Sequence, residues 1–210
     1  MSNPSEASLP PGAAGGDDVD ETRRKLLLAT CIAGGVATGA ATWPFLASME
    51  PSERAKALGA PVEADISALA PGEQMVVEWQ GKPVWVVHRT PEMMASLKKD
   101  EAKLADPASK RSDQPEYAQN EWRARADKKD VLVVVGICTH LGCSPTSKFA
   151  PGDPSMGADW PGGFFCPCHG SQFDLSARVF RNFPAPDNLP VPPYMYLSDA
   201  KLLIGDDSKA

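Results

Sequence analysis

Two short runs hold four of the five cysteines and two of the three histidines in this 210-residue chain. They are Cys138-Thr139-His140-Leu141-Gly142-Cys143 and Cys166-Pro167-Cys168-His169-Gly170-Ser171. Each run offers one cysteine and one histidine at ligand spacing, and each has one further cysteine. Thiolates and imidazoles both bind transition metals. Two of each suit either a structural zinc ion or an iron–sulfur centre with mixed ligands.

Zinc and a disulfide framework are the alternatives to an iron–sulfur centre. Structural zinc usually takes Cys-x2-4-Cys and His-x3-5-His pairs, whereas these runs give Cys-x-His beside Cys-x-Cys-His. A zinc site would also leave Cys143 and Cys168 unexplained, although these two could bond to each other. Five cysteines are few for a purely disulfide-bonded scaffold. The pattern therefore favours the iron–sulfur centre.

The two runs resemble the double signature of the Rieske proteins, residue for residue. The resemblance implies one 2Fe–2S cluster with two sulfur and two nitrogen ligands: Cys138 and Cys166 on the inner iron, His140 and His169 on the outer iron. It also implies a disulfide between Cys143 and Cys168. Neutral imidazoles in place of two thiolates raise the potential from about −400 mV to roughly −150 to +300 mV, a range that suits quinol oxidation.

The resemblance also assigns roles to residues beside the ligands. Ser171 matches a serine that donates to a bridging sulfide. Phe173 stands where high-potential members usually have a tyrosine that donates to a cysteine sulfur. Such hydrogen bonds stabilise the reduced cluster, so we expect a lower potential than in tyrosine-bearing relatives. Residues 182–186, Asn-Phe-Pro-Ala-Pro, resemble the loop that covers the cluster in this family, with Phe183 in place of its usual glycine.

The family further indicates which side chains meet partners. His169 is expected to accept the hydrogen bond from the quinol, and His140 faces the same edge. Leu141 and Pro167, at the tips of the two runs, are expected to help the protein dock on cytochrome b.

The first 49 residues have a different composition. Residues 1–21 lack apolar periodicity, which predicts a disordered cytoplasmic tail. Arg23 and Arg24 precede an apolar stretch and resemble a twin-arginine export signal; a basic flank that orients a membrane helix is the other interpretation. Residues 26–49 carry no charge and suffice to cross a bilayer, and Pro44 should bend or end the helix. Because no Ala-x-Ala cleavage site ends this stretch, we expect an uncleaved anchor over residues 22–49.

The remainder predicts a tether and an all-β head. Residues 50–60 are mixed in charge and end in small residues, which indicates a flexible tether. Residues 51–69 resemble the tether of the Rieske subunit of ubiquinol–cytochrome c reductase, although an ordinary connector is the alternative. The head, residues 61–210, is expected to have the Rieske fold: a base of antiparallel strands and a small cluster-binding subdomain over about residues 137–186.

Apolar runs and turn signals predict the strands of the head. They are expected over residues 76–79 and 84–88 around a turn at 80–83, over 131–135, and as a closing pair over 194–197 and 201–204. Only Pro91 to Lys99 is predicted to be helical, with proline in the first turn. His88 lies on a predicted strand, so a structural role is expected.

Residues 100–130 are charged and polar and lack a sustained period. We interpret them as an insertion on the surface of the head, with Tyr117 and Trp122 as isolated anchors. The net charge of −6 argues against a nucleic-acid partner.

Taken with the resemblance, the sequence predicts the iron–sulfur subunit of a bacterial ubiquinol–cytochrome c reductase. It would be anchored by a single span in the inner membrane, with its head in the periplasm. The implied partners are ubiquinol, a cytochrome b subunit and a c-type cytochrome, in a homodimeric complex. The alternatives are the Rieske subunit of another periplasmic oxidoreductase, such as arsenite oxidase, and the ferredoxin of a dioxygenase. The spare cysteine pair and the apolar segment argue against the ferredoxin.

Overall fold

The computed structural model describes residues 20–208. The predicted tail therefore lies, up to residue 19, outside the described residues. The chain divides into two compact units, one ending at Ser52 and the other beginning at Glu53. Each unit is built around its own secondary structure, so the two are described separately.

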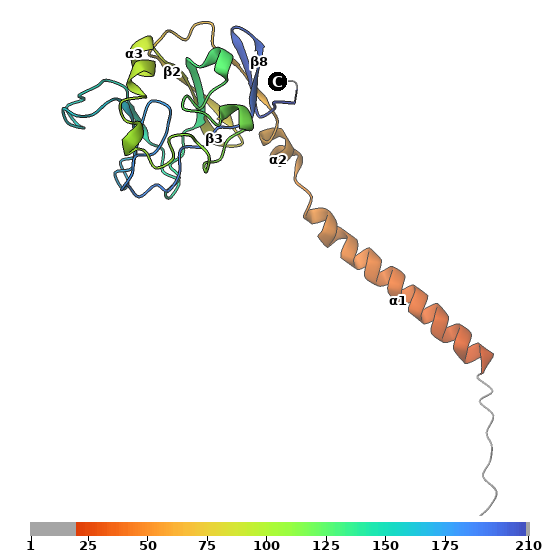
Figure 1. Cartoon of the computed structure of the whole chain (residues 1–210). Coiled ribbons are helices and arrows are strands. Elements are labelled where there is room, and N and C mark those ends of the chain that lie inside the picture. The colour runs from red at the N-terminus through yellow and green to blue at the C-terminus, as the bar shows by residue number, and fades with distance from the viewer. Residues whose placement is uncertain (1–19, 209–210) are drawn as a thin grey trace, which may run out of the picture. The chain divides into compact units, whose positions relative to one another are not determined.

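The first unit contains one long helix, α1, which spans Glu21–Ser48 (Figure 1). The side chain of Asp20 accepts a hydrogen bond from the backbone N–H of Thr22 and caps the helix. At 1.5 Å per residue, its 28 residues span about 42 Å, more than the ~30 Å hydrocarbon core of a bilayer. Pro44 was expected to bend or end the helix, but α1 continues to Ser48. Pro44 therefore does not end the helix, although proline has no N–H to donate within it.

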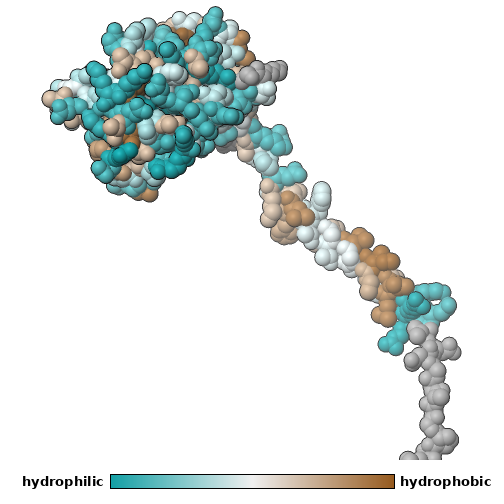
Figure 2. Space-filling view, in the orientation of Figure 1, coloured by the Kyte–Doolittle hydropathy of each residue, from teal (hydrophilic) through white to brown (hydrophobic). Residues whose placement is uncertain are grey.

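Helix α1 is long and apolar enough to cross a membrane, judged by length and composition. Figure 2 shows hydrophilic residues at its beginning and apolar residues beyond them. Arg23, Arg24 and Lys25 stand in that hydrophilic part, and Leu26, Leu27 and Leu28 follow directly. This charge step is the feature expected where a membrane helix meets the aqueous phase.

The second unit begins with a short helix, α2, over Glu53–Leu58. Lys56 and Glu53 form an ion pair across one turn, with 2.9 Å between Nζ and Oε1. The segment from residue 50 to residue 60 therefore contains a helical turn rather than extended chain alone.

Three antiparallel sheets of three strands each make up the head. The first, in the order β1-β9-β8, contains Val62–Asp65, Lys201–Ile204 and Tyr194–Ser198. The second, in the order β2-β3-β4, contains Gln74–Trp79, Lys82–His88 and Val131–Val135. The third, in the order β5-β6-β7, contains Thr146–Lys148, Gly163–Phe165 and Gln172–Phe173. Strands outnumber helices in the described part of the head, as predicted, and both cysteine runs adjoin the third sheet, one before β5 and the other between β6 and β7.

The predicted hairpin forms from β2 and β3, but its turn is shorter than expected. Only Gln80 and Gly81 connect the strands, and both have positive φ angles, 54° and 70°. Two-residue turns with positive φ at both positions match the right-handed twist of the strands in a hairpin. Lys82 and Pro83 already belong to β3, where Pro83 pairs with Glu78.

The helix predicted to begin at Pro91 is observed as α3, Pro91–Ser96, and it ends three residues earlier than predicted. The hydroxyl of Thr90 accepts a hydrogen bond from the backbone N–H of Met93 at 3.3 Å and caps it. Three 3-10 turns follow along the chain: η1 Glu101–Lys103, η2 Glu116–Ala118 and η3 Ala126–Lys128.

Residues 100–130 do not simply lie on the surface, so that prediction was wrong in part. Leu104, Asp106 and Arg123 are buried. Arg123 donates to the backbone oxygen of Ala177 and to the side chain of Gln114, at 3.2 and 3.1 Å. Burial lowers the pKa of Arg123 to about 9. The polar composition of this segment therefore reflects internal hydrogen bonding as well as solvent exposure.

An aromatic stack joins the second and third sheets. The rings of Trp85, on β3, and Phe164, on β6, lie 5.1 Å apart at an angle of 17°. Trp85 also covers Gly136, where an added Cβ would come within 2.2 Å of the indole. Only glycine allows so close an approach. Gly136 lies two residues before Cys138, and Phe164 lies two residues before Cys166, so one ring pair supports the beginning of both cysteine runs.

Candidate metal centre

The run from Cys138 to Cys143, here called the first ligand loop, follows β4. Its backbone folds back on itself through two hydrogen bonds. The N–H of Cys138 donates to the oxygen of Cys143 at 2.8 Å, and the N–H of Gly142 donates to the oxygen of Cys138 at 3.0 Å. Gly142 has a φ of +81°, a conformation that glycine adopts without strain.

The run from Cys166 to Ser171, the second ligand loop, connects β6 and β7 and repeats this backbone. The N–H of Cys166 donates to the oxygen of Ser171 at 2.8 Å, and the N–H of Gly170 donates to the oxygen of Cys166 at 2.9 Å. Gly170 has a φ of +80°. The two runs therefore form turns of one kind, although their side chains differ.

Two of the four cysteines in the loops are joined and two are free. Cys143 and Cys168 form the disulfide expected from the family resemblance. Cys138 and Cys166 are free and only 2% exposed. The sulfur of Cys166 lies within 4.8 Å of both disulfide sulfurs, but bonded sulfurs offer no thiolate. Cys138 and Cys166 are thus the two cysteines of the loops that remain available as sulfur ligands for a metal.

The imidazole rings of the two histidines in the loops contact each other. The rings of His140 and His169 lie 4.7 Å apart, edge to face at 86°. His140 is half-buried and His169 is exposed. The site therefore has buried sulfur on its inner side and accessible nitrogen on its outer side.

The environment of Cys138 fits a metal ligand. Burial raises the pKa of this thiol, and neighbouring Cys166 raises it further, while hydrogen bonds from the His140 backbone and the Ser171 side chain lower it. Two adjacent buried thiols favour their neutral forms unless a cation compensates for the charge of the thiolates. Two thiols and two imidazoles that converge in this way suit the mixed ligand set of a 2Fe–2S cluster.

Ser171 and Phe173 line the inner side of the second ligand loop, and both are fully buried. The hydroxyl oxygen of Ser171 accepts a hydrogen bond from the N–H of Ala185 at 3.0 Å. Its proton is therefore available for the hydrogen bond to the Cys138 sulfur described above. Phe173 pairs with Phe164 in the third sheet and has no polar atom to offer.

Residues 182–188, here called the proline loop, extend the predicted loop at 182–186 by two residues and contact both ligand loops. Ala185 binds Ser171 in the second loop, as described. The hydroxyl of Thr139 in the first loop donates to the backbone oxygen of Asp187 at 2.6 Å. The contact through Thr139 was not anticipated from the sequence, where a threonine between two ligands carries no distinguishing signal.

The tips of the ligand loops are open to solvent. Leu141 is 69% exposed, which is unusual for a large apolar side chain. Pro167 is exposed as well. His169 lies on the same exposed stretch as Pro167.

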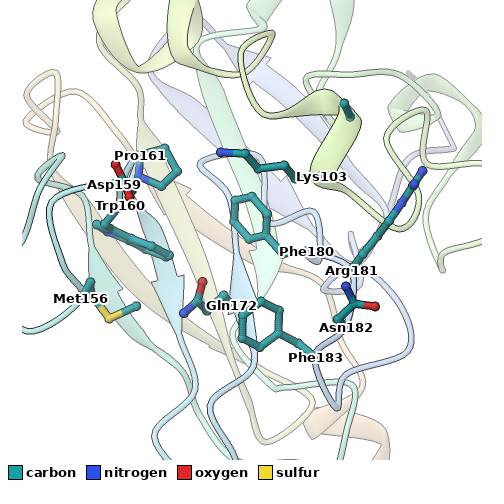
Figure 3. Close-up of a pocket in the computed structure, with 11 residues that line it drawn as sticks. Lys103, Met156, Asp159, Trp160, Pro161, Gln172, Phe180, Arg181, Asn182 and Phe183 are labelled. Atoms are coloured by element: carbon teal, nitrogen blue, oxygen red, sulfur yellow. The ribbon is translucent and has the colours of Figure 1, made fainter.

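A groove of about 490 Å³ lies beside the second ligand loop. Figure 3 shows Trp160 on one side and Phe180 and Phe183 on the other. Gln172, the neighbour of Ser171, contributes to its lining. The groove adjoins the candidate metal centre but is lined by none of its candidate ligands, and no sequence pattern indicated it.

Comparison with known proteins defines the class. The family model described as "Rieske [2Fe-2S] domain" matches residues 61–193. A second model, described as "Ubiquitinol-cytochrome C reductase Fe-S subunit TAT signal", matches residues 13–52. The fold and the site are therefore those of a Rieske domain that binds one 2Fe–2S cluster, and a signal segment of the matching family precedes it.

The relatives narrow this class. The chain is 57% identical over 185 residues to the "Ubiquinol-cytochrome c reductase iron-sulfur subunit" of Allochromatium vinosum, with 88% of each protein covered. It is 44% identical to the subunit of that name from Bradyrhizobium diazoefficiens, with 88% of this chain and 94% of the relative covered. For Blastochloris viridis the identity is 42%, with 91% and 97% covered. The chain belongs to the family of ubiquinol–cytochrome c reductase iron–sulfur subunits.

This assignment confirms the predicted family and fold, the oxidoreductase complex and the cofactor. It also favours the quinol complex over an arsenite oxidase subunit or a dioxygenase ferredoxin, because the three relatives named above share one name and are matched over 88–97% of their length.

Proposed function

We propose that this chain takes electrons from ubiquinol and passes them to a c-type cytochrome, with Cys138, Cys166, His140 and His169 as the ligands of its cluster. One observation carries the proposal: two loops with the same backbone bring two buried thiols and two touching imidazoles together. A bound Rieske cluster supplies a one-electron acceptor of raised potential.

The histidines are the groups that meet the quinol in this proposal. An imidazole has two ring nitrogens, so a histidine that binds iron through one keeps the other for a hydrogen bond. His169 is exposed, and its second nitrogen would accept a hydrogen bond from the quinol hydroxyl when it carries no proton of its own. His140 lies against it and shares the same edge. The buried cysteines keep water from the sulfur side.

The exposed loop tips form the docking surface of the proposal. Leu141 and Pro167 present apolar surface beside His169, and such surface is stabilised when a partner covers it. We assign this surface to cytochrome b, so that the quinol site is completed where the two subunits meet.

Membrane attachment follows from the first unit. Residues 22–49 serve as an uncleaved anchor in the inner membrane, preceded by a cytoplasmic tail over residues 1–21. Residues 50–60 are the tether, and residues 61–210 form the head in the periplasm, with its cluster-binding subdomain at about 137–186. The disulfide supports this orientation, because such bonds persist in an oxidising compartment. The complex is expected to be homodimeric.

Purification from membranes tests the proposal. We expect cytochrome b and a c-type haem to accompany the chain, with about two irons per chain and the paramagnetic signal of a reduced Rieske cluster. Recovery of a molybdenum protein would instead support the oxidoreductase alternative. One zinc ion per chain in place of iron would overturn the ligand assignment.

Variants of the cysteines sharpen this test. Cys138→Ala and Cys166→Ala should each lose the iron and reduce quinol–cytochrome c reductase activity to background. The matched control is Cys31→Ala, which removes a free, exposed cysteine of α1. This variant should keep the iron and the reductase activity. Wild-type iron content in either loop variant would contradict the proposed ligand set.

A further inference from the structure

Residues 106–112 of the insertion form a compact turn around one buried carboxylate. Asp106 is 7% exposed. Its oxygens accept hydrogen bonds from the backbone N–H groups of Lys110, Arg111 and Ser112, at 2.9, 3.0 and 3.1 Å. The hydroxyl of Ser112 donates to the same carboxylate at 2.9 Å. Four donors on one carboxylate fix the shape of this segment, here called the buttress.

Asn188, the last residue of the proline loop, is the main contact of the buttress. It is 1% exposed. Its side-chain amide donates to the backbone oxygen of Asp106 at 3.0 Å and to the hydroxyl of Ser109 at 3.2 Å. Its backbone N–H donates to the hydroxyl of Ser112 at 3.1 Å. Because these groups are buried, breaking one contact leaves an unsatisfied polar atom.

A second contact lies at the surface. The guanidinium of Arg111 pairs with the carboxylate of Asp187 at 2.9 Å and donates to the backbone oxygen of Pro186 at 2.7 Å. Both side chains are substantially exposed, 60% and 39%, so this pair is the weaker of the two connections.

The proline loop transmits this anchoring to both ligand loops. Its Asp187 oxygen holds the hydroxyl of Thr139, and its Ala185 N–H binds the hydroxyl oxygen of Ser171. The Ala185 contact occupies an acceptor site on Ser171, which leaves the hydroxyl proton to point toward the sulfurs. Moving the proline loop would thus free this hydroxyl to rotate and would open the site to water.

We propose that the buttress is a positioning element for the cluster: through Asn188 it holds the proline loop against both ligand loops and so maintains the hydrogen bond from Ser171. The inference rests on the proposed ligands. It gives residues 100–130 a role that their polar composition conceals, because the segment tunes the electron carrier without touching it.

Neutral substitutions test the buttress without changing the charge of the protein. Ser112→Ala removes the hydroxyl that both Asp106 and Asn188 use. Asn188→Ala removes the side-chain contacts to the buttress and also the acceptor of the Val179 N–H, so Ser112→Ala is the more selective variant. In the intact complex we expect a lower midpoint potential in both variants, more so in Asn188→Ala, because the reduced cluster loses a hydrogen bond. The paramagnetic spectrum of the reduced cluster should broaden, and amide exchange at residues 184–188 should accelerate.

The chain offers a matched control for the serine. Ser155 also donates to a nearby carboxylate, that of Asp153, at 2.5 Å, but it is exposed and lies outside the buttress. Ser155→Ala should leave the potential, the spectrum and the exchange at residues 184–188 unchanged. If Asn188→Ala does not fold, Ser112→Ala against this control decides the question.

The exposed pair separates positioning from a direct effect of charge. Arg111→Ala removes a positive charge and Asp187→Asn a negative one, so a direct electrostatic effect shifts the potential in opposite directions. If the pair acts by positioning the proline loop, the midpoint potential falls in both variants. The fall should be smaller than in Ser112→Ala. An unchanged or raised potential in Asp187→Asn contradicts the inference for this pair.

Two further results would overturn the proposal. The first is a wild-type midpoint potential and a wild-type paramagnetic spectrum in Ser112→Ala. The second is faster amide exchange at residues 184–188 in that variant while the potential and the spectrum stay unchanged. These outcomes differ from failure of the proposed function, in which the wild-type protein itself contains no 2Fe–2S cluster.

Discussion

The two ligand loops share one backbone and differ in the order of their side chains. Both begin with a buried free cysteine, and both have glycine with a φ near +80° in fifth place. Histidine is third in the first loop, as His140, and fourth in the second, as His169. The disulfide cysteine is last in the first loop, as Cys143, but third in the second, as Cys168.

This difference shows how one turn performs two tasks. The shared hydrogen bonds place the two free thiols in equivalent positions at the start of each loop. The shifted order then lets the disulfide connect the loops and lets the two imidazoles meet. In the second loop, the last place is left for Ser171, which binds the proline loop. The backbone thus provides the frame, and the order of side chains provides the asymmetry.

The largest effect should come from separating the loops. A Cys143→Ala/Cys168→Ala double variant opens a disulfide between residues 25 apart in sequence. In the chain-entropy model this lowers the free energy of unfolding by about 3 kcal/mol. Urea unfolding of the purified chain measures this difference, with Cys31→Ala as the control that should not change it. A loss below about 1 kcal/mol would mean that the shared frame holds the loops together without the disulfide.

Alanine substitutions of the two loop glycines should have a smaller effect on stability and test whether the two turns are equivalent. An alanine Cβ at Gly142 or Gly170 would have no atom within 4 Å, so only the backbone conformation opposes it. We expect Gly142→Ala and Gly170→Ala each to lower the free energy of unfolding by about 1 kcal/mol.

The control for the glycines is Gly81→Ala in the β2–β3 turn. Its φ is +70°, and it too has open space around its Cβ position. Its stability should fall by a similar amount, while the paramagnetic spectrum of the cluster changes only in the two loop variants. Clearly unequal losses in Gly142→Ala and Gly170→Ala would break the equivalence of the turns.

The smallest effect concerns the side chain that follows the second loop. Phe173→Tyr adds a hydroxyl that can donate to a cysteine sulfur. A hydrogen bond of about 1 kcal/mol in favour of the reduced cluster raises a one-electron potential by roughly 40 mV. A redox titration measures the shift, and Phe149→Tyr, which adds a hydroxyl to a half-buried ring packed against Phe164, should leave it unchanged. A potential that stays constant or falls in Phe173→Tyr would refute the assigned role.

Short-range patterns made much of the molecule predictable. The hairpin of β2 and β3, the buried strand β4 and the pair of β8 and β9 follow from alternating or continuous apolar residues beside turn residues. The ligand runs were recognisable because each is a contiguous string with few alternative uses. The disulfide was accessible only through the family resemblance, since cysteine spacing alone does not determine pairing.

Contacts between distant polar residues were not predictable. Asp106 and Asn188 are 82 positions apart, and neither stands in a distinctive motif. Their partnership depends on burial, which the charged composition of residues 100–130 argued against. The pairing of β1 with β9 is of the same kind, because Val62 meets Ile204 from the opposite end of the head. A single sequence records local preference well, but it does not record which polar groups fold inward together.

The stacked rings of Trp85 and Phe164 have a mechanical consequence. One indole rests on Gly136 ahead of the first free thiol, and its partner ring precedes the second. A displacement of β3 or β6 would therefore move the beginnings of both ligand loops. The second sheet and the beginnings of both ligand loops are therefore expected to move together, because neither ring can shift without disturbing its stacked partner.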